Sequence, residues 1–269
     1  MPSSNDPERR RRSIAIVGAT GGIGRAIVET FLSENVALYL SGGARFDELR
    51  KLVPPKNGAS IRAFRADLAS VDGAAKLVGE FLAALRTDQR TDRPTLDGLV
   101  VASGVDLMTP DNKALDFAAR LEKAWRIDVA STISIARGLS GALSEREDGS
   151  TGGCVLFGWS GVARGQEGET SQIYAACKGA VVAFAKSLAQ ELAPKVRVNS
   201  ISPGWIKTTW GEIASPKARA RAERDSLLGR WGTAREVAAA VRFLLSESSA
   251  FVNGVDLPID GGFSVARDK

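Results

Sequence analysis

The chain has 269 residues, of which 44% are hydrophobic and 25% charged, and this composition gives a globular protein enough apolar side chains for a large core. It contains no histidine, so histidine-based catalytic triads and histidine-ligated zinc are excluded. The two cysteines, Cys154 and Cys177, cannot form a disulfide framework and are not at metal-ligand spacing. We therefore expect no metal site and a reducing, cytoplasmic location.

The formal net charge is +5, but the basic residues are scattered except for a block of four arginines at residues 9–12. We interpret this block as the end of a solvated leader, residues 1–12. An arm that binds polyanions is the weaker alternative, so no nucleic-acid partner is expected. The N-terminus lacks the apolar stretch of a secretory signal, and no apolar run is long enough to span a membrane. The remaining sequence divides into one domain, residues 13–263, and a tail, residues 264–269.

Short runs of aliphatic and β-branched residues alternate with longer amphipathic stretches along the chain. This alternation predicts βαβ units and a parallel sheet, and continuous apolar runs indicate strands covered on both faces. We expect a single Rossmann-like, doubly wound α/β fold of about seven parallel strands flanked by helices on both faces. The polar segments 87–94 and 145–152 are expected to be surface loops or extended helix ends. The expected strands are residues 13–17, 36–40, 60–64, 96–101, 153–158, 196–201 and 255–258, and the expected helices are residues 23–32, 46–52, 74–86, 115–143, 173–192, 217–228 and 234–245.

A glycine-rich turn follows the first expected strand, where residues 18–24 read GATGGIG. Glycines at positions 18, 22 and 24 allow a sharp turn and the close approach of a ligand, because no Cβ intervenes. The N-terminus of the next helix presents unpaired N–H groups and a partial positive charge to a pyrophosphate. A tight structural turn explains many such sequences, but the position between a strand and a helix favours a dinucleotide site.

Tyr174 and Lys178 are four residues apart and therefore share one face of an expected helix. A free tyrosine, with a pKa of about 10, transfers protons poorly at neutral pH, and a nearby cation favours its phenolate form. Ser160 follows an expected strand, where its hydroxyl could hydrogen-bond a substrate carbonyl as negative charge develops. Because a Tyr and a Lys at this spacing often occur by chance, the interpretation as a catalytic site depends on Ser160 and on the glycine turn as well.

Together these segments resemble the short-chain dehydrogenase/reductase family, whose glycine motif has the G-x-x-x-G-x-G spacing of residues 18–24. The resemblance covers about residues 13–263 in the family's order and points to the subgroup similar to 3-oxoacyl-carrier-protein reductases. It implies an oxidoreductase that transfers a hydride between a nicotinamide cofactor and a carbonyl or alcohol substrate. In such an enzyme Tyr174 would transfer the proton, Lys178 would tune Tyr174 and hold the ribose, and Ser160 would polarise the carbonyl.

The resemblance also implies a set of cofactor contacts. Asp67 resembles the acid that contacts the adenine, and Ile206 and Thr208 resemble the residues that meet the nicotinamide carboxamide. The GRWG of residues 229–232 and the DGG of residues 260–262 resemble the family's C-terminal signatures. The full expected set is Gly18, Thr20, Gly22, Ile23, Gly24, Ser41, Arg45, Asp67, Leu68, Ala102, Gly104, Tyr174, Lys178, Pro203, Gly204, Ile206 and Thr208.

Three positions depart from the family's pattern. Residues 101–104 read VASG where the family has Asn-Asn-Ala-Gly, and Val17 stands where a threonine often opens the glycine motif. Both changes remove polar side chains near the same strand ends. They can compensate each other, because losing both hydrogen-bonding groups destabilises a protein less than leaving one buried polar group unpaired.

The third departure is Asp128, which stands where the family usually has an asparagine that helps hold a proton-relay water near the lysine. We include Asp128 among the catalytic candidates. Close to the site, its charge would raise the pKa of Tyr174 and oppose Lys178. The alternative is that Asp128 is a surface residue one helical turn away from the aligned position.

The second expected strand ends in SGGAR, residues 41–45, without an acid that would hydrogen-bond a ribose 2′-hydroxyl and repel a 2′-phosphate. Arg45 and Arg25 are nearby cations that could pair with a phosphate. The alternatives are a solvated loop charge for Arg45 and a plain first-turn residue for Arg25. We favour NADP(H) over NAD(H).

By resemblance, residues 204–232 form the substrate lid, which contains Trp205, Trp210 and Trp231, while Trp159 precedes the serine. These aromatic side chains would suit a bulky apolar substrate, although packing within the lid explains them equally well. We expect a small-molecule carbonyl or acyl substrate and, by resemblance, a homo-oligomer, either a tetramer or a dimer. The alternative function is a catalytically impaired cofactor-binding or scaffold protein, for which the changes at residues 101–103 and 128 are the support.

Overall fold

A seven-stranded parallel sheet forms the centre of the protein. The computed structural model describes residues 11–52, 58–143, 151–208 and 214–266. Its strands lie in the order β3-β2-β1-β4-β5-β6-β9. From β1 the chain adds strands outward to β3 on one side and then, starting with β4, outward on the other side, as in a doubly wound fold. The predicted fold class is therefore confirmed. The bounds are β1 (Arg12–Val17), β2 (Val36–Gly42), β3 (Ser60–Arg65), β4 (Gly98–Val101), β5 (Gly152–Phe157), β6 (Val196–Pro203) and β9 (Asp256–Ile259).

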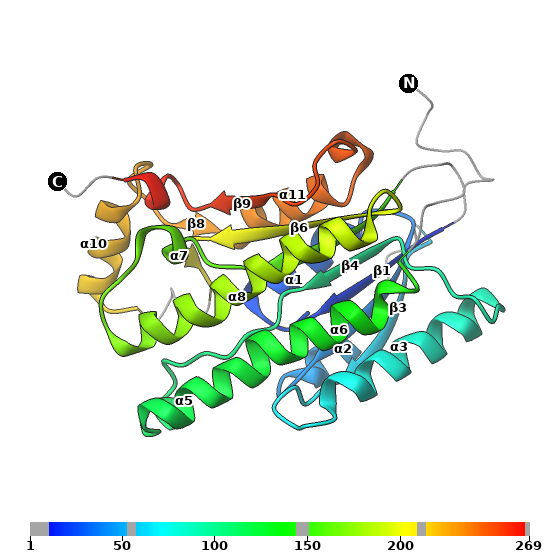
Figure 1. Cartoon of the computed structure of the whole chain (residues 1–269), viewed down its shortest axis with the longest axis horizontal. Coiled ribbons are helices and arrows are strands. Elements are labelled where there is room, and N and C mark those ends of the chain that lie inside the picture. Colours follow the sequence, from blue (N-terminus) through cyan, green and yellow to red (C-terminus); the bar gives the residue numbers. More distant parts are fainter. Residues whose placement is uncertain (1–10, 53–57, 144–150, 209–213, 267–269) are drawn as a thin grey trace.

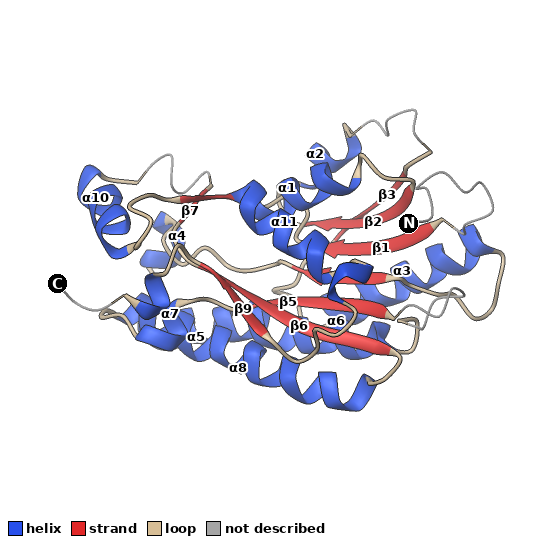
Figure 2. Ribbon diagram, turned by 90° about the horizontal axis from the view of Figure 1, so that it is seen from above, coloured by secondary structure: helices blue, strands red, loops and turns tan. Residues whose placement is uncertain are grey.

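Helices cover both faces of this sheet (Figure 2). One face packs against α1 (Gly22–Phe31), α2 (Phe46–Arg50) and α11 (Ala234–Leu244). The other packs against α3 (Gly73–Gln89), α6 (Ser131–Ser140) and α8 (Glu169–Leu192), with α5 (Phe117–Ala124) at the end of this layer. Alternate residues of a strand therefore enter different cores: Ile14 and Ile16 lie in one apolar cluster, Ala15 and Val17 in the other. This is why the central strands read as continuous apolar runs.

Several shorter elements gather at the end of the sheet where the parallel strands finish (Figure 1). They include α7 (Gly161–Arg164), α10 (Pro216–Asp225) and a two-stranded parallel pair, β7 (Ile206–Lys207) with β8 (Gly232–Thr233). Because ligands of open α/β sheets bind at the carboxyl ends of the strands, this end holds the candidate site. Among the described residues, four short helices were not predicted: α7, α4 (Pro110–Lys113), η2 (Glu247–Ser249) and η3 (Phe263–Val265).

The single helix expected over residues 115–143 is wrong as one continuous α-helix. It consists of α5, a π-helical turn η1 (Trp125–Ala130) and α6, which ends at Ser140. The start is fixed by Asp116, whose Oδ1 accepts a hydrogen bond from the N–H of Ala119 (2.8 Å). A π turn adds one residue to a helical turn, and this insertion does not interrupt the apolar pattern that predicts the helix.

Smaller differences occur at element ends. Helix α10 ends three residues early, because Ser226 is extended and the N–H of Leu228 donates to the carbonyl of Gly261. Gly152, expected in a loop, begins β5, and α3 extends into the polar segment 87–94. Arg11 and Arg12, assigned to the leader, contact the folded chain through the carbonyls of Val36 and Leu245. The rest of the leader and most of segment 145–152 lie outside the described residues.

Candidate active site

The glycine turn links the carboxyl end of β1 to α1 and is closely packed. Gly18 has a φ of +82°, and a Cβ there would lie 2.7 Å from the backbone nitrogen of Ser103. A Cβ at Gly24 would lie 2.1 Å from the carbonyl oxygen of Gly18, so both positions require glycine. Gly21 caps α1 without a side-chain hydrogen bond from the described residues, which leaves the first N–H groups of the helix open to an anion.

The neighbouring residues predicted to bind the cofactor surround this turn. Ser41 contributes its carbonyl, which accepts the N–H of Ala19 (2.9 Å), and the side chain of Thr20 packs on Gly42. Ile23 packs into the core beneath the turn. The side chain of Thr208 lies over Gly22, where a Cβ would be 2.8 Å from that of Thr208. The structure therefore brings the end of segment 204–208 onto the glycine turn.

The end of β4 lies directly beside Gly18. Val17 and Val101, which replace polar family residues, are buried in the same apolar cluster, and the N–H of Ala102 donates to the carbonyl of Val17 (2.9 Å). The hydroxyl oxygen of Ser103 is buried and has no hydrogen-bond partner among the described residues. A glycine cradle, an open helix N-terminus and an unpaired hydroxyl fit the pyrophosphate and ribose of a dinucleotide.

The carboxyl ends of β2 and β3 carry the residues expected at the adenosine. Asp67 is exposed, and its Oδ1 accepts the N–H of Ala69, while Leu68 packs against the core. Arg45 is exposed at the N-terminus of α2. Arg25 is already flanked by the carboxylates of Glu29 and Glu48, each at 3.5 Å. Of the two arginines considered for a phosphate, Arg45 is therefore the better placed.

Ser160 lies just beyond β5 and precedes α7. Its hydroxyl donates to the carbonyl of Pro203 (3.1 Å), and its backbone N–H donates to the same oxygen (3.2 Å). Pro203 is the last residue of β6, and the N–H of the following Gly204 donates to the carbonyl of Ile259 (3.1 Å). Ser160 is thus fixed at the ends of two adjacent strands.

Tyr174 and Lys178 lie one turn apart on α8 and face the loop after β4. The phenol of Tyr174 donates to the carbonyl of Val105 (3.0 Å), and its ring meets the ring of Trp159 edge to face, with centroids 5.8 Å apart. Nζ of Lys178 lies 6.0 Å from the centroid of the Tyr174 ring. Since Trp159 directly precedes Ser160, the predicted serine, tyrosine and lysine come together at one end of the sheet.

Asp128 forms an ion pair with Lys178, with 2.6 Å between Oδ1 and Nζ. It is carried by the π turn η1 and is 1% exposed, so the alternative of a surface position for Asp128 is wrong. Its other oxygen accepts the N–H of Val105 (3.4 Å). Gly104 borders the pair, because a Cβ there would lie 2.8 Å from Oδ1 of Asp128 and 3.4 Å from Nζ of Lys178. The π turn is the local feature that delivers this carboxylate, as such turns often do at functional sites.

This arrangement raises the pKa of Tyr174. Burial of the phenol is the main cause, and the charges of Asp128 and Asp106 add to it. Burial and Asp128 also raise the pKa of Cys177 to about 11, while Lys178 lowers it. A raised pKa of Tyr174 is the effect expected of an Asp128 that lies close to the site. Lys178 does not bring the pKa of Tyr174 below that of a free tyrosine.

Sequence reasoning missed the two backbone acceptors of the site. The carbonyls of Val105 and Pro203 hold the hydroxyls of Tyr174 and Ser160, and a backbone carbonyl leaves no mark in the sequence. Asp106, which follows Val105, was also missed. Its side chain accepts the N–H of Met108 (2.8 Å), which is a local turn rather than a recognisable motif.

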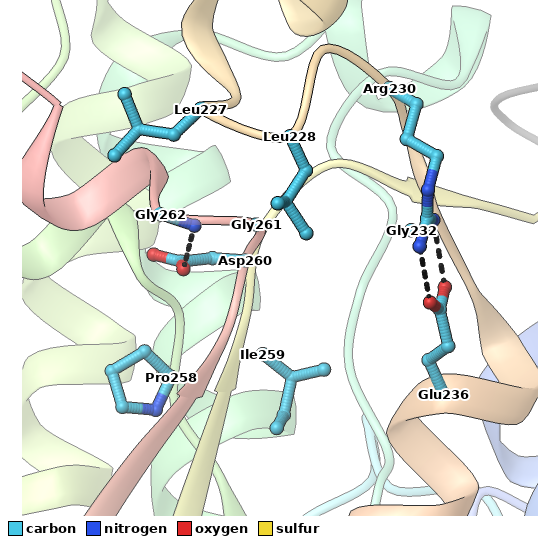
Figure 3. A pocket seen from close by; sticks show the side chains of 10 residues that line it. All are labelled: Leu227, Leu228, Arg230, Gly232, Glu236, Pro258, Ile259, Asp260, Gly261 and Gly262. Carbon is cyan, nitrogen blue, oxygen red and sulfur yellow. Dashed lines mark hydrogen bonds and ion pairs between the residues drawn. The ribbon is translucent and has the colours of Figure 1, made fainter.

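A cavity of about 400 Å³ lies beside this site, at the base of segment 204–232 (Figure 3). Arg230 and Glu236 face each other across one side of it, with 2.7 Å between Nη2 and Oε1. Of the lid tryptophans, Trp205 and Trp231 pack on each other with centroids 5.6 Å apart, and Trp210 lies outside the described residues. The lining residues are Leu227, Leu228, Arg230, Gly232, Glu236, Pro258, Ile259, Asp260, Gly261 and Gly262, so the catalytic candidates are not among them.

Within the described ranges, no group of three or more Cys, Asp or Glu side chains could hold a metal ion. No helix in the same ranges has the length and apolar character needed to cross a membrane.

Comparison with known proteins gives a consistent result. Residues 18–264 match the family model described as enoyl-(acyl carrier protein) reductase. The chain is 29% identical to YmfI of Bacillus subtilis, an uncharacterized oxidoreductase, over 94% of this chain and 98% of that protein. It is 27% identical to a 3-oxoacyl-[acyl-carrier-protein] reductase, FabG, of Chlamydia pneumoniae, over 94% of this chain and 97% of that protein.

A solved structure of similar fold points to the same family as these relatives. The crystal structure of a short-chain dehydrogenase/reductase (glucose/ribitol dehydrogenase) from Brucella melitensis superposes with a TM-score of 0.78 at 29% identity. The alignment covers 95% of this chain and 97% of that chain. The chain belongs to the short-chain dehydrogenase/reductase family and is an NAD(P)-dependent oxidoreductase that acts on CH–OH and C=O groups.

Proposed function

We propose that the protein interconverts a small-molecule carbonyl or acyl-linked ketone and its alcohol, with Tyr174, Lys178 and Ser160 as its catalytic residues. The observation that carries this proposal is the convergence of the three side chains at the carboxyl ends of β4, β5 and β6, beside the glycine turn. A bound nicotinamide cofactor supplies or accepts the hydride. The hydroxyl of Ser160 turns from the Pro203 carbonyl to hydrogen-bond the substrate oxygen, and Tyr174 transfers the proton.

Several residues are proposed to hold the cofactor. The glycine turn with Thr20 and Ile23 receives the pyrophosphate, and Ser41, Asp67 and Leu68 border the adenosine. Ala102, Gly104 and Lys178 lie at the ribose, where the ammonium is held in place by its ion pair. Pro203, Gly204, Ile206 and Thr208 border the nicotinamide. Thr208 already lies over Gly22, which supports a cofactor running from the glycine turn to Ser160.

NADP(H) is the proposed cofactor in preference to NAD(H). The end of β2 carries no acid, and Arg45, exposed at the start of α2, is available to a 2′-phosphate. The proposed setting is a reducing one, the cytoplasm, since Cys154 and Cys177 are both free and buried. A homo-oligomer, a dimer or a tetramer, is the proposed assembly. Exposed apolar side chains such as Phe251 and Val265 support it.

The test is a screen of ketones with NADPH, followed by Tyr174→Phe on any ketone that is turned over. Turnover should fall by at least about a thousandfold in this variant, because the proton donor is lost, while NADPH still binds. Tyr39→Phe is the matched control, since Tyr39 is the only other tyrosine and lies on β2. Wild-type turnover in Tyr174→Phe would refute the mechanism.

A further inference from the structure

We propose that Asp128 is a positioning residue that binds the ammonium of Lys178 and keeps Tyr174 in its neutral phenol form near neutral pH, so that alcohol oxidation, which starts from the phenolate, rises only in alkaline solution. The inference rests on the proposed role of Tyr174 in proton transfer. It adds a pH dependence to the reaction and assigns that dependence to one carboxylate.

The first observation is the ion pair itself. Asp128 is 1% exposed and Lys178 is 6% exposed, so little water screens the contact between them. Nζ of Lys178 is 2.6 Å from Oδ1 of Asp128 but 6.0 Å from the centroid of the Tyr174 ring. The ammonium therefore acts mainly on the carboxylate. Together the two charges leave Tyr174 with almost no net positive field to stabilise a phenolate.

The second observation is the hydrogen bond of the phenol. Tyr174 donates to the carbonyl oxygen of Val105 at 3.0 Å, and a carbonyl oxygen accepts only from a group that carries a hydrogen. A phenolate at this place would face that oxygen without a donor between them. The backbone is held in position because the N–H of Val105 donates to Asp128. Asp128 thus fixes both the lysine and the loop that receives the phenol.

The other ionisable groups around Tyr174 act in the same direction. Cys177 lies on α8 itself, Asp128 on η1 and Asp106 in the loop after β4, and each raises the pKa of Tyr174 beyond the effect of burial. Ser160, which precedes α7, carries no charge, and the charged residue of α7, Arg164, lies over the ring of Phe263, 5.1 Å from its centroid. Lys178 is the nearby cation on α8, and its partner is the carboxylate of Asp128. The described surroundings therefore favour the neutral phenol.

A neutral phenol is a proton donor. In reduction, a hydride from the reduced nicotinamide adds to the carbonyl carbon, and the C=O π pair becomes a lone pair on oxygen. That oxygen takes the proton of Tyr174, whose O–H bond breaks and leaves a phenolate. The phenolate regains a proton from water, because Tyr174 is only partly buried. Oxidation of the alcohol requires the phenolate before the reaction starts, and so requires alkaline solution.

The chain offers a direct measurement, because Tyr39 and Tyr174 are its two tyrosines. In Tyr39→Phe, the ultraviolet absorption of tyrosinate reports Tyr174 alone, without substrate or cofactor. We expect no ionisation at or below pH ~10, the ordinary pKa of tyrosine. Adding Asp128→Asn should lower the midpoint by at least ~1 pH unit, since the lysine charge then acts on the phenol. Adding Asp111→Asn, the same charge loss at an exposed residue of α4, should leave it unchanged.

The kinetic counterpart is the pH profile in each direction. The rate of alcohol oxidation should rise with pH, and Asp128→Asn should shift this rise to lower pH by the same interval as the tyrosinate midpoint. Asp111→Asn should not shift it. An unchanged tyrosinate midpoint in the Asp128→Asn background would overturn the proposal. Ionisation of Tyr174 below pH ~9 in the Tyr39→Phe protein would overturn it without any change at Asp128. If Tyr174→Phe kept its turnover, the proposed mechanism would fail instead, and the titration would still report on Asp128.

Discussion

Gly104 lies against Asp128 so closely that a Cβ at position 104 would stand 2.8 Å from Oδ1 of the carboxylate. The same Cβ would be 3.4 Å from Nζ of Lys178, so an alanine here displaces the ion pair rather than a flexible surface group. Gly104→Ala should reduce turnover by about tenfold to a hundredfold, because small misplacements of catalytic groups have effects of this size.

The matched control for this change is Gly141→Ala. Gly141 follows α6, and nothing lies within 4 Å of a Cβ built there. Steady-state kinetics and thermal unfolding of the two variants separate an effect on the site from an effect on the fold. Equal turnover in Gly104→Ala and wild type would show that the ion pair tolerates displacement.

Gly18 of the glycine turn should not tolerate replacement. Its φ of +82° costs an alanine about 1–2 kcal/mol, and the Cβ would also meet the backbone of Ser103 at 2.7 Å. Gly18→Ala should therefore lose both stability and binding of 2′,5′-ADP, measured by chemical denaturation and calorimetry.

Gly79→Ala on α3 is the control for Gly18→Ala, since nothing lies within 4 Å of its Cβ. An alanine inside a helix should stabilise the protein by roughly 0.5–1 kcal/mol. If Gly18→Ala bound 2′,5′-ADP like the wild type, the turn would not be the pyrophosphate site.

Arg45 should determine the preference for a 2′-phosphate. Arg45→Gln should weaken 2′,5′-ADP binding by about tenfold or more, because a charge-assisted hydrogen bond is worth ~1.5–3 kcal/mol. Binding of ADP, which lacks the 2′-phosphate, should not change. Arg50→Gln removes the same charge at the other end of α2 and should affect neither nucleotide. Tighter binding of ADP than of 2′,5′-ADP by the wild type would overturn the NADP(H) assignment.

The protein should lose stability in alkaline solution. Burial raises the pKa of Cys154 to about 12, and the pKa values of Cys177, Tyr39 and Tyr174 are raised as well. Above pH ~8.5 the unfolded chain ionises first at its cysteines, so the folded state binds more protons and the free energy of unfolding falls as pH rises. Each such group contributes about 1.4 kcal/mol per pH unit between its two pKa values.

Denaturant titrations between pH 8 and pH 10.5 measure this slope. Cys154→Ala removes one buried thiol and should make the slope shallower, whatever its effect on stability at pH 8. A slope that does not change on this substitution would show that Cys154 ionises in the folded protein.

The sheet could be predicted from the sequence because its strands are buried on both faces. Runs such as residues 14–17 and 98–101 are apolar along their length, and all seven expected strands are present with ends shifted by at most two residues. The π turn at Asp128 could not be predicted, since an insertion of one residue leaves the apolar pattern of the surrounding helices intact.

The grouping of the candidate site residues could be foreseen in part. Tyr174, Lys178 and Ser160 stand out because their chemistry is in their side chains. Their contacts depend on the fold. The sheet brings the carbonyl of Val105 to Tyr174 and the carbonyl of Pro203 to Ser160, although these residues are far apart in the sequence. The ion pair of Asp128 with Lys178 joins residues that are fifty apart in the chain, and periodicity within one helix carries no information about such a pair.

The strand order separates two halves of the active site. Arg45 follows β2, whereas Gly104 follows β4 and borders the carboxylate of Asp128, and β1 lies between β2 and β4. Two strand spacings amount to about 10 Å, a distance at which substitutions usually act independently. Cofactor choice and the protonation of the tyrosine are therefore separable traits. A descendant of this protein can exchange one nucleotide for the other and keep the pH dependence of its reaction.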